Sequence, residues 1–179
     1  MGIGVTKIFF TILVSNLIRI FRFIPNNDPI MSFMLPFSKQ EKLSVAVFFP
    51  IITMVSFDLI TGFVGIWTIV TALTYGFLGA FFFFTYKKFK KIKMKHYLAS
   101  GVVGVLIFDF VTGVMMMPLL FGYSFEIALI GQIPFTILHL ATVSGFVLVF
   151  TPLVEKFILD NKNLEDSKVK AFFINVARA

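Results

Sequence analysis

The sequence predicts an all-α fold: an integral membrane bundle of about six transmembrane helices with a weak internal repeat. Hydrophobic residues make up 58% of the 179 residues, and 26 residues are Phe, whereas soluble domains average about 45–50% apolar residues. Apolar runs near the ~20 residues that cross a bilayer alternate with short polar turns. Within these runs, FDLITG at residues 57–62 returns as FDFVTG at residues 108–113. We therefore expect a single membrane domain.

The first part of the chain leaves its topology open. Residues 3–23 form an apolar span, and the prolines in residues 24–29 predict a sharp turn. Residues 30–37 are apolar but too few to cross ~30 Å unaided, so they predict a short helix, a re-entrant segment or half of a broken span. If they complete a crossing, there are six spans and both termini are cytoplasmic. If they are re-entrant, there are five spans and the N-terminus is outside.

Four further spans are expected at residues 43–60, 66–86, 97–119 and 125–157. Pro50, Pro134 and Pro152 are expected to bend the helices that contain them. Short turns at residues 62–65 and 121–124 join the spans in pairs. The polar residues after position 159 predict a transmembrane bundle over 1–159 and a cytoplasmic tail over 160–179.

A cluster of positive charge sets the expected orientation. Six lysines lie at positions 87, 88, 90, 91, 93 and 95, and basic loops stay on the cytoplasmic side of membranes. The short turns then lie outside, in a multi-pass protein of the cell membrane. Because the lysines accompany no soluble domain, we expect them to face the lipid bilayer surface and no nucleic acid.

The repeated carboxylates Asp58 and Asp109 are the first candidates for function. A carboxylate inside a span costs about 2.5–3.5 kcal/mol on insertion scales, so it usually faces a cavity or a partner. Both are expected about one helical turn before the outer end of their spans, on one face with Thr61 and Thr112 respectively. One interpretation is a polar binding site near the outer surface. The other is structural, with each Asp pairing with a helix end or an arginine.

Further candidates come from the turn, from a polar stripe and from the single Trp. Asn27 is explained by turn chemistry or by a ligand site at the mouth of the bundle. Gln132 and His139, with Thr136 between them, share one helix face and predict either packing residues or ligand contacts. Trp67 fits either a membrane-interface belt or a surface on which a flat ligand stacks.

The sequence offers no recognisable catalytic arrangement. It has no cysteine, no HExxH motif and no glycine-rich phosphate loop. We therefore expect no enzyme, no cofactor and no metal site. Any transport energy must come from a gradient or from a partner protein.

Several segments resemble the substrate-binding S components of energy-coupling factor (ECF) transporters. These are residues 25–29 (PNNDP), Phe57-Asp58 with Thr61-Gly62, Gly65-Ile66-Trp67 and Tyr75-Gly76-x-x-Gly79, and residues 131–139 are similar to the last helix of some relatives. The resemblance covers about residues 3–157. It implies six helices with both termini inside, and a vitamin or similar micronutrient bound near the outer face.

The resemblance also implies partners: a transmembrane T component and two cytoplasmic ATPases. It places Arg22 inward, near the outer site. The first span lacks the Ala-x-x-x-Ala pair with which many S components dock. We therefore expect docking through Ala72, Gly76 and Ala80, or no use of the shared module. The alternatives are a self-contained ion-coupled carrier or channel acting as an oligomer, a membrane-embedded enzyme, and a non-catalytic membrane partner subunit.

Overall fold

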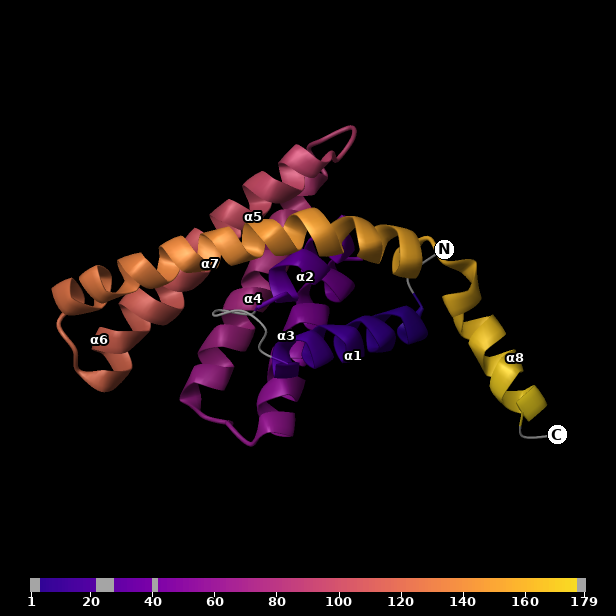
Figure 1. Ribbon diagram of the computed structural model, residues 1–179, viewed down its shortest axis with the longest axis horizontal. Coiled ribbons are helices and arrows are strands. Elements are labelled where there is room, and N and C mark those ends of the chain that lie inside the picture. The colour runs from indigo at the N-terminus through magenta and orange to yellow at the C-terminus, as the bar shows by residue number, and fades with distance from the viewer. Residues whose placement is uncertain (1–3, 22–27, 40–41, 177–179) are drawn as a thin grey trace.

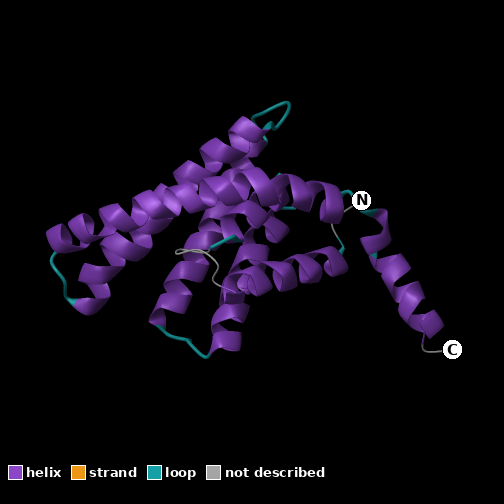
Figure 2. Cartoon of the chain, viewed as in Figure 1, coloured by secondary structure: helices purple, strands orange, loops and turns teal. Residues whose placement is uncertain are grey.

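A computed structural model describes residues 4–21, 28–39 and 42–176, and every regular element in these residues is a helix (Figures 1 and 2). The helices are α1 (Val5–Phe21), α2 (Ile30–Ser38), α3 (Leu43–Thr61), α4 (Ile66–Tyr86), α5 (Met94–Asp109), α6 (Met116–Phe121), α7 (Phe125–Val154) and α8 (Asp166–Val176). A π-helical turn, Phe110–Met115, joins α5 to α6. A second, Glu155–Leu159, extends α7, and a 3₁₀ turn, Lys162–Leu164, precedes α8.

Four helical segments are long and apolar enough to cross a membrane: Leu43–Thr61, Ile66–Tyr86, Met94–Phe121 and Phe125–Leu159. The predicted all-α membrane bundle is therefore confirmed. The predicted count of about six spans is not supported in the described residues. At 1.5 Å per residue, the 17 residues of α1 extend about 25 Å and the nine of α2 about 14 Å, less than the ~30 Å hydrocarbon core.

The spanning helices form two hairpins, α3–α4 and α5–α6–α7, which diverge at their turns (Figure 1). In the first hairpin, Gly79 lies so close to the backbone of Ala46 that a Cβ there would overlap it, and Gly76 packs against Ile51. Ala72 and Gly76 are buried. Gly76, a member of the row expected to dock a T component, therefore packs α4 against α3.

The short helix α2 lies at the centre of the molecule. All nine of its residues are buried, and it contacts α3, α4, α5 and α7. Phe37 stacks on Phe49 at 4.4 Å between ring centroids, and Phe33 lies 5.5 Å from Phe150. A helix that is apolar all round is stable only when neighbours enclose it. Residues 30–37 are therefore a short helix surrounded by longer ones.

Contacts at both ends fix the position of α1. Near its start, the Lys7 ammonium donates to the Leu159 carbonyl at 2.5 Å. Near its end, the Asn16 amide donates to the Ser56 hydroxyl at 2.8 Å, and the Arg19 guanidinium lies 3.8 Å from the centroid of the Phe57 ring. The helix therefore runs from the C-terminal end of the long seventh helix to the C-terminal part of α3.

The long helix α7 crosses the whole bundle, whereas the C-terminal tail lies apart from it. With its π-helical end, α7 extends over 35 residues without interruption at Pro134 or Pro152, and Figure 1 shows it as one curved helix. By contrast, α8 leaves the bundle (Figure 1), and its first residue, Asp166, accepts hydrogen bonds from the start of α1.

Candidate functional site

A deeply buried contact between two polar side chains joins the two arms of the second hairpin. His139 Nδ1, in the middle of α7, lies 2.7 Å from Asp109 Oδ1, at the end of α5, and each residue is 2% exposed. The other polar atom of each side chain, Asp109 Oδ2 and His139 Nε2, has no hydrogen-bond partner among the described residues. Buried polar atoms are rarely left in this state, because each costs about 1–3 kcal/mol. The pair is therefore a place where a further polar group gains an interaction.

Asp109 lies further from the end of its span than one helical turn. The helix continues through Phe121, about 18 Å further on, which agrees with the predicted span to residue 119. Gly62 ends the first copy of the repeat with a left-handed φ of 74°. The matching Gly113 stays helical, and the Gln132 amide occupies the space where its Cβ would be. The prediction that both carboxylates lie one turn from the outer end is therefore wrong for Asp109.

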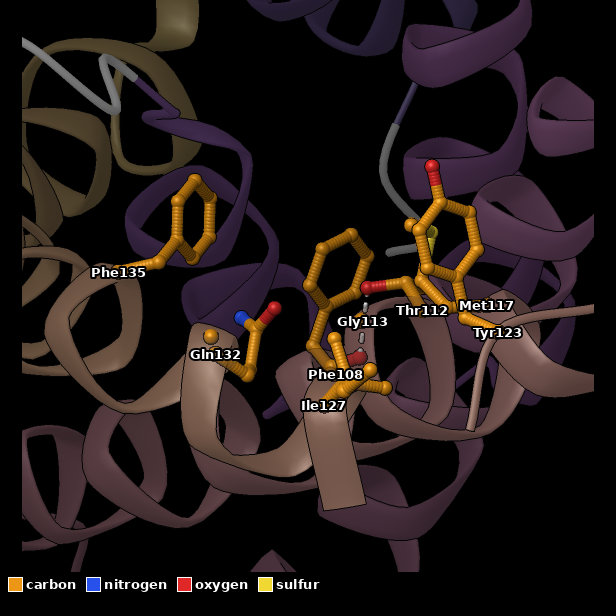
Figure 3. Close-up of a pocket in the computed structure, with 10 residues that line it drawn as sticks. Phe108, Thr112, Gly113, Met117, Tyr123, Ile127, Gln132 and Phe135 are labelled. Carbon is orange, nitrogen blue, oxygen red and sulfur yellow. Dashed lines mark hydrogen bonds between the residues drawn. The ribbon is translucent and has the colours of Figure 1, made fainter. Parts of the chain in front are cut away.

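A pocket of about 480 Å³ lies next to this pair on the second hairpin. Figure 3 shows the rings of Phe108, Tyr123 and Phe135 around it, with the Gln132 amide pointing between Phe108 and Phe135. It is lined by Phe108, Thr112, Gly113, Met117, Tyr123, Ile127, Ala128, Gly131, Gln132 and Phe135. The pocket therefore has aromatic walls and three polar groups: the Thr112 hydroxyl, the Gln132 amide and the Tyr123 phenol.

Two of the pocket's rings enclose the imidazole of the pair. The centroid of the His139 ring lies 5.7 Å from that of Phe135 and 6.1 Å from that of Phe108. Gln132 also lines a second hollow, of about 240 Å³, together with Asp109 and Thr136. The predicted stripe of Gln132, Thr136 and His139 thus faces α5, and Gln132 stands between the two hollows.

The first copy of the repeat forms a separate, satisfied contact. Asp58 is 4% exposed, and its carboxylate accepts a hydrogen bond from the Thr68 hydroxyl of α4 at 2.5 Å. Thr61 donates to the Phe57 carbonyl at 2.9 Å, as Thr112 does to the Phe108 carbonyl at 2.8 Å. Asp58 therefore joins α3 to α4 within the first hairpin and does not line the pocket. Sequence reasoning missed Thr68, whose position just across the short turn is the signal that could have found it.

Trp67 also lies apart from the pocket. It is 41% exposed, and its indole N–H donates to the Phe63 carbonyl at 3.0 Å. This geometry fits an interface belt residue at the turn of the first hairpin. Two other predicted residues, Arg22 and Asn27, are outside the described residues.

A third cluster of polar contacts, which the sequence did not predict, surrounds Asp28. Its carboxylate accepts from the Tyr75 hydroxyl at 2.6 Å and from the Ile30 backbone N–H at 3.0 Å, and lies 3.9 Å from Arg19 Nε. Among the described residues, Arg19 thus pairs with Asp28 and with neither repeated Asp. The Tyr75 ring lies 4.5 Å from that of Phe108, so this group lies behind the pocket.

The described residues hold no cluster of three or more His, Cys, Asp or Glu side chains that could bind a metal ion. No family model, curated protein or solved structure matches the chain. The pocket on the second hairpin and the polar pair behind it therefore carry the functional interpretation by themselves.

Proposed function

We propose that this chain is the substrate-binding membrane subunit of an uptake transporter for a vitamin-like micronutrient. The observation that carries the proposal is the pocket of about 480 Å³ whose aromatic rings enclose His139, with Asp109 behind it. Sites for small molecules commonly have volumes of about 300–1,000 Å³, apolar and aromatic walls and a few placed polar groups. The pocket meets each of these criteria.

The lining of the pocket narrows the chemistry of the solute. Phe108, Tyr123 and Phe135 favour a flat ring, and Gln132 offers both an amide donor and an amide acceptor. The two atoms without partners, Asp109 Oδ2 and His139 Nε2, lie behind this wall. A small solute that combines a ring with a few hydrogen-bonding groups suits these features best.

The same proposal includes six membrane-embedded helices and partner subunits. Lys7 at the start of α1 contacts Leu159, and Lys39 just after α2 lies 2.7 Å from Glu155, so both termini of the α1–α2 unit lie near the end of α7. This arrangement supports a unit that enters and returns to the cytoplasmic side. Because the sequence has no glycine-rich phosphate loop, ATP-driven transport requires a T component and ATPases, as in ECF transporters.

Native mass spectrometry of the detergent-purified protein tests the proposal. A stoichiometric small-molecule adduct that leaves on mild activation is the expected result, and its mass identifies the solute class. Gln132→Leu should weaken the retention of that adduct by about 1–3 kcal/mol, because a buried polar contact is lost. Thr71→Val on the first hairpin is the control, since Thr71 bonds only carbonyls of its own helix. Absence of any adduct from wild-type protein, together with no binding of a vitamin panel, would contradict the proposal.

A second candidate function is a self-contained carrier coupled to protons. The observation that favours it is again the buried Asp109–His139 pair, because carboxylate–imidazole pairs inside membranes often form proton relays. Proteoliposomes that contain the purified chain alone distinguish the two. Solute uptake driven by a pH gradient supports the carrier, whereas uptake that requires added T component and ATPases supports the binding subunit.

A further inference from the structure

A third hollow lies at the other end of the bundle, beneath the lysine-rich segment. It has a volume of about 200 Å³ and lies between α4 and α5. Phe81, Phe89 and Val103 line it and are 39–46% exposed, so in helices that cross the membrane this groove faces lipid. Ala99 lines the same groove, and its short side chain leaves the space open.

The charge beside the groove is positive and unpaired. Six lysines occur between positions 87 and 95. Within the described residues, Lys39 forms an ion pair with Glu155, and none of the six lysines pairs with a carboxylate. Lys87 directly follows Tyr86, which lines the groove, and its ammonium lies 4.2 Å from the centroid of the Phe83 ring. A region of positive charge therefore lies where lipid headgroups meet the bundle.

Aromatic side chains form the floor of the groove. Tyr86 and Phe82 line it and are 4% and 1% exposed, so they belong to the packed interior. Phe81, Phe89 and Val103 lie around them and are exposed, which leaves an apolar surface on which a hydrocarbon chain can pack.

We propose that this groove binds one anionic phospholipid of the cytoplasmic leaflet. An acyl chain lies along Phe81, Ala99 and Val103, and the phosphate lies among the lysines. A basic loop alone would explain membrane orientation. The apolar groove directly beneath it adds a place for a hydrocarbon chain, which neither a free phosphate nor a nucleic acid would fill. This site lies outside the pocket of the proposed function and does not depend on it.

Native mass spectrometry with added phosphatidylglycerol or phosphatidylcholine, matched in acyl chains, tests the proposal. Wild-type protein should retain one phosphatidylglycerol molecule in preference to phosphatidylcholine. Ala99→Trp fills the groove and keeps the charge, whereas the triple variant Lys90→Gln/Lys91→Gln/Lys93→Gln removes charge and keeps the groove. The triple variant should lower this retention by at least about tenfold, because basic residues near an anionic surface each contribute to binding. Ala99→Trp should lower it by at least about tenfold as well, because its ring takes the space of the acyl chain. The control Lys168→Gln/Lys170→Gln in α8 removes the same kind of charge elsewhere and should leave it unchanged.

Ala99→Leu serves as a milder filling variant in case the Trp variant does not fold, and it should lower retention in the same direction. Equal retention of the two lipids by wild-type protein would overturn the proposal. The proposal would also be overturned if a folded groove-filling variant retained phosphatidylglycerol at the wild-type level. Lipid binding would then be a diffuse attraction of the lysines to anionic headgroups.

Discussion

His139 Nδ1 and Asp109 Oδ1 lie 2.7 Å apart and join the middle of α7 to the end of α5, with both side chains almost fully buried. The pair lies behind the pocket that we propose as the solute site. Its burial makes the pair important for stability, since breaking a buried pair leaves an uncompensated polar group.

We expect His139→Leu to destabilise the protein by about 3–5 kcal/mol, because it leaves the Asp109 carboxylate buried and alone. The double variant Asp109→Leu/His139→Leu removes both polar groups and should be less destabilised than His139→Leu alone. Unfolding by SDS in mixed micelles measures both. Additive losses in the double variant would show that the two side chains are not coupled.

The two copies of the repeat should respond differently to the same substitution. Asp109→Asn should weaken solute binding by about 1–3 kcal/mol, because Asp109 lies behind the pocket. Asp58→Asn should leave solute affinity unchanged and lower only stability, because Asp58 bonds Thr68 in the other hairpin. Binding titrations with the solute identified by mass spectrometry compare the two. A matching loss of affinity in both variants would mean that the site spans both hairpins.

Close packing in the first hairpin predicts contrasting effects of two Gly→Ala substitutions. Gly79→Ala should destabilise the protein by about 1–3 kcal/mol, because its Cβ would overlap the Ala46 backbone. Gly145→Ala has open space around its Cβ in α7 and should be neutral or stabilising by up to about 1 kcal/mol. Thermal unfolding in detergent measures both. Similar melting temperatures for the two variants would contradict the packing of α4 on α3.

Asp166, at the start of α8, predicts a pH dependence outside the membrane. Its carboxylate accepts hydrogen bonds from the backbone N–H groups of Thr6, at 2.8 Å, and Val5, at 3.0 Å. These bonds, with that from Thr6 the largest cause, lower the pKa of Asp166 below its ordinary value of 3.8. The contribution of this carboxylate to stability is therefore present above that value and is lost as the pH falls through the lower pKa of the folded state.

Hydrogen exchange at the Val5 and Thr6 amides measures this contact. Their protection should fall as the pH drops below 3.8, once the known pH dependence of intrinsic exchange is removed. Asp166→Asn should show lower protection at neutral pH and no such acid transition. An identical pH profile in wild type and variant would show that Asp166 does not hold the start of α1.

Composition and periodicity were sufficient to predict the helical class, because lipid requires every backbone polar group to be satisfied within a helix. They also placed Gln132, Thr136 and His139 on one face, which the structure turns toward α5. The two Asp positions could not be distinguished from sequence. Their hexamers are alike, and the difference appears only in the fold, where the second copy stays helical and Gln132 packs against Gly113.

Other features depend on contacts between distant segments. The sequence shows Asp28 as a turn residue and Tyr75 as a residue within the span 66–86, and nothing local links them across 47 positions. The short length of α2 was evident, but its enclosure by four other helices follows from tertiary packing. Hydrophobicity alone does not separate such a helix from one that lies against lipid.

The central claim, that the pocket on the second hairpin binds a small solute, is tested most directly by filling it. Gly131 lines the pocket and Gly145 lies further along α7, and neither has an atom within 4 Å of an added Cβ. Native mass spectrometry should therefore detect the solute on wild-type protein and on Gly145→Trp, but not on Gly131→Trp. Retention of the solute by a folded Gly131→Trp variant would contradict the claim, because the solute would then lie elsewhere.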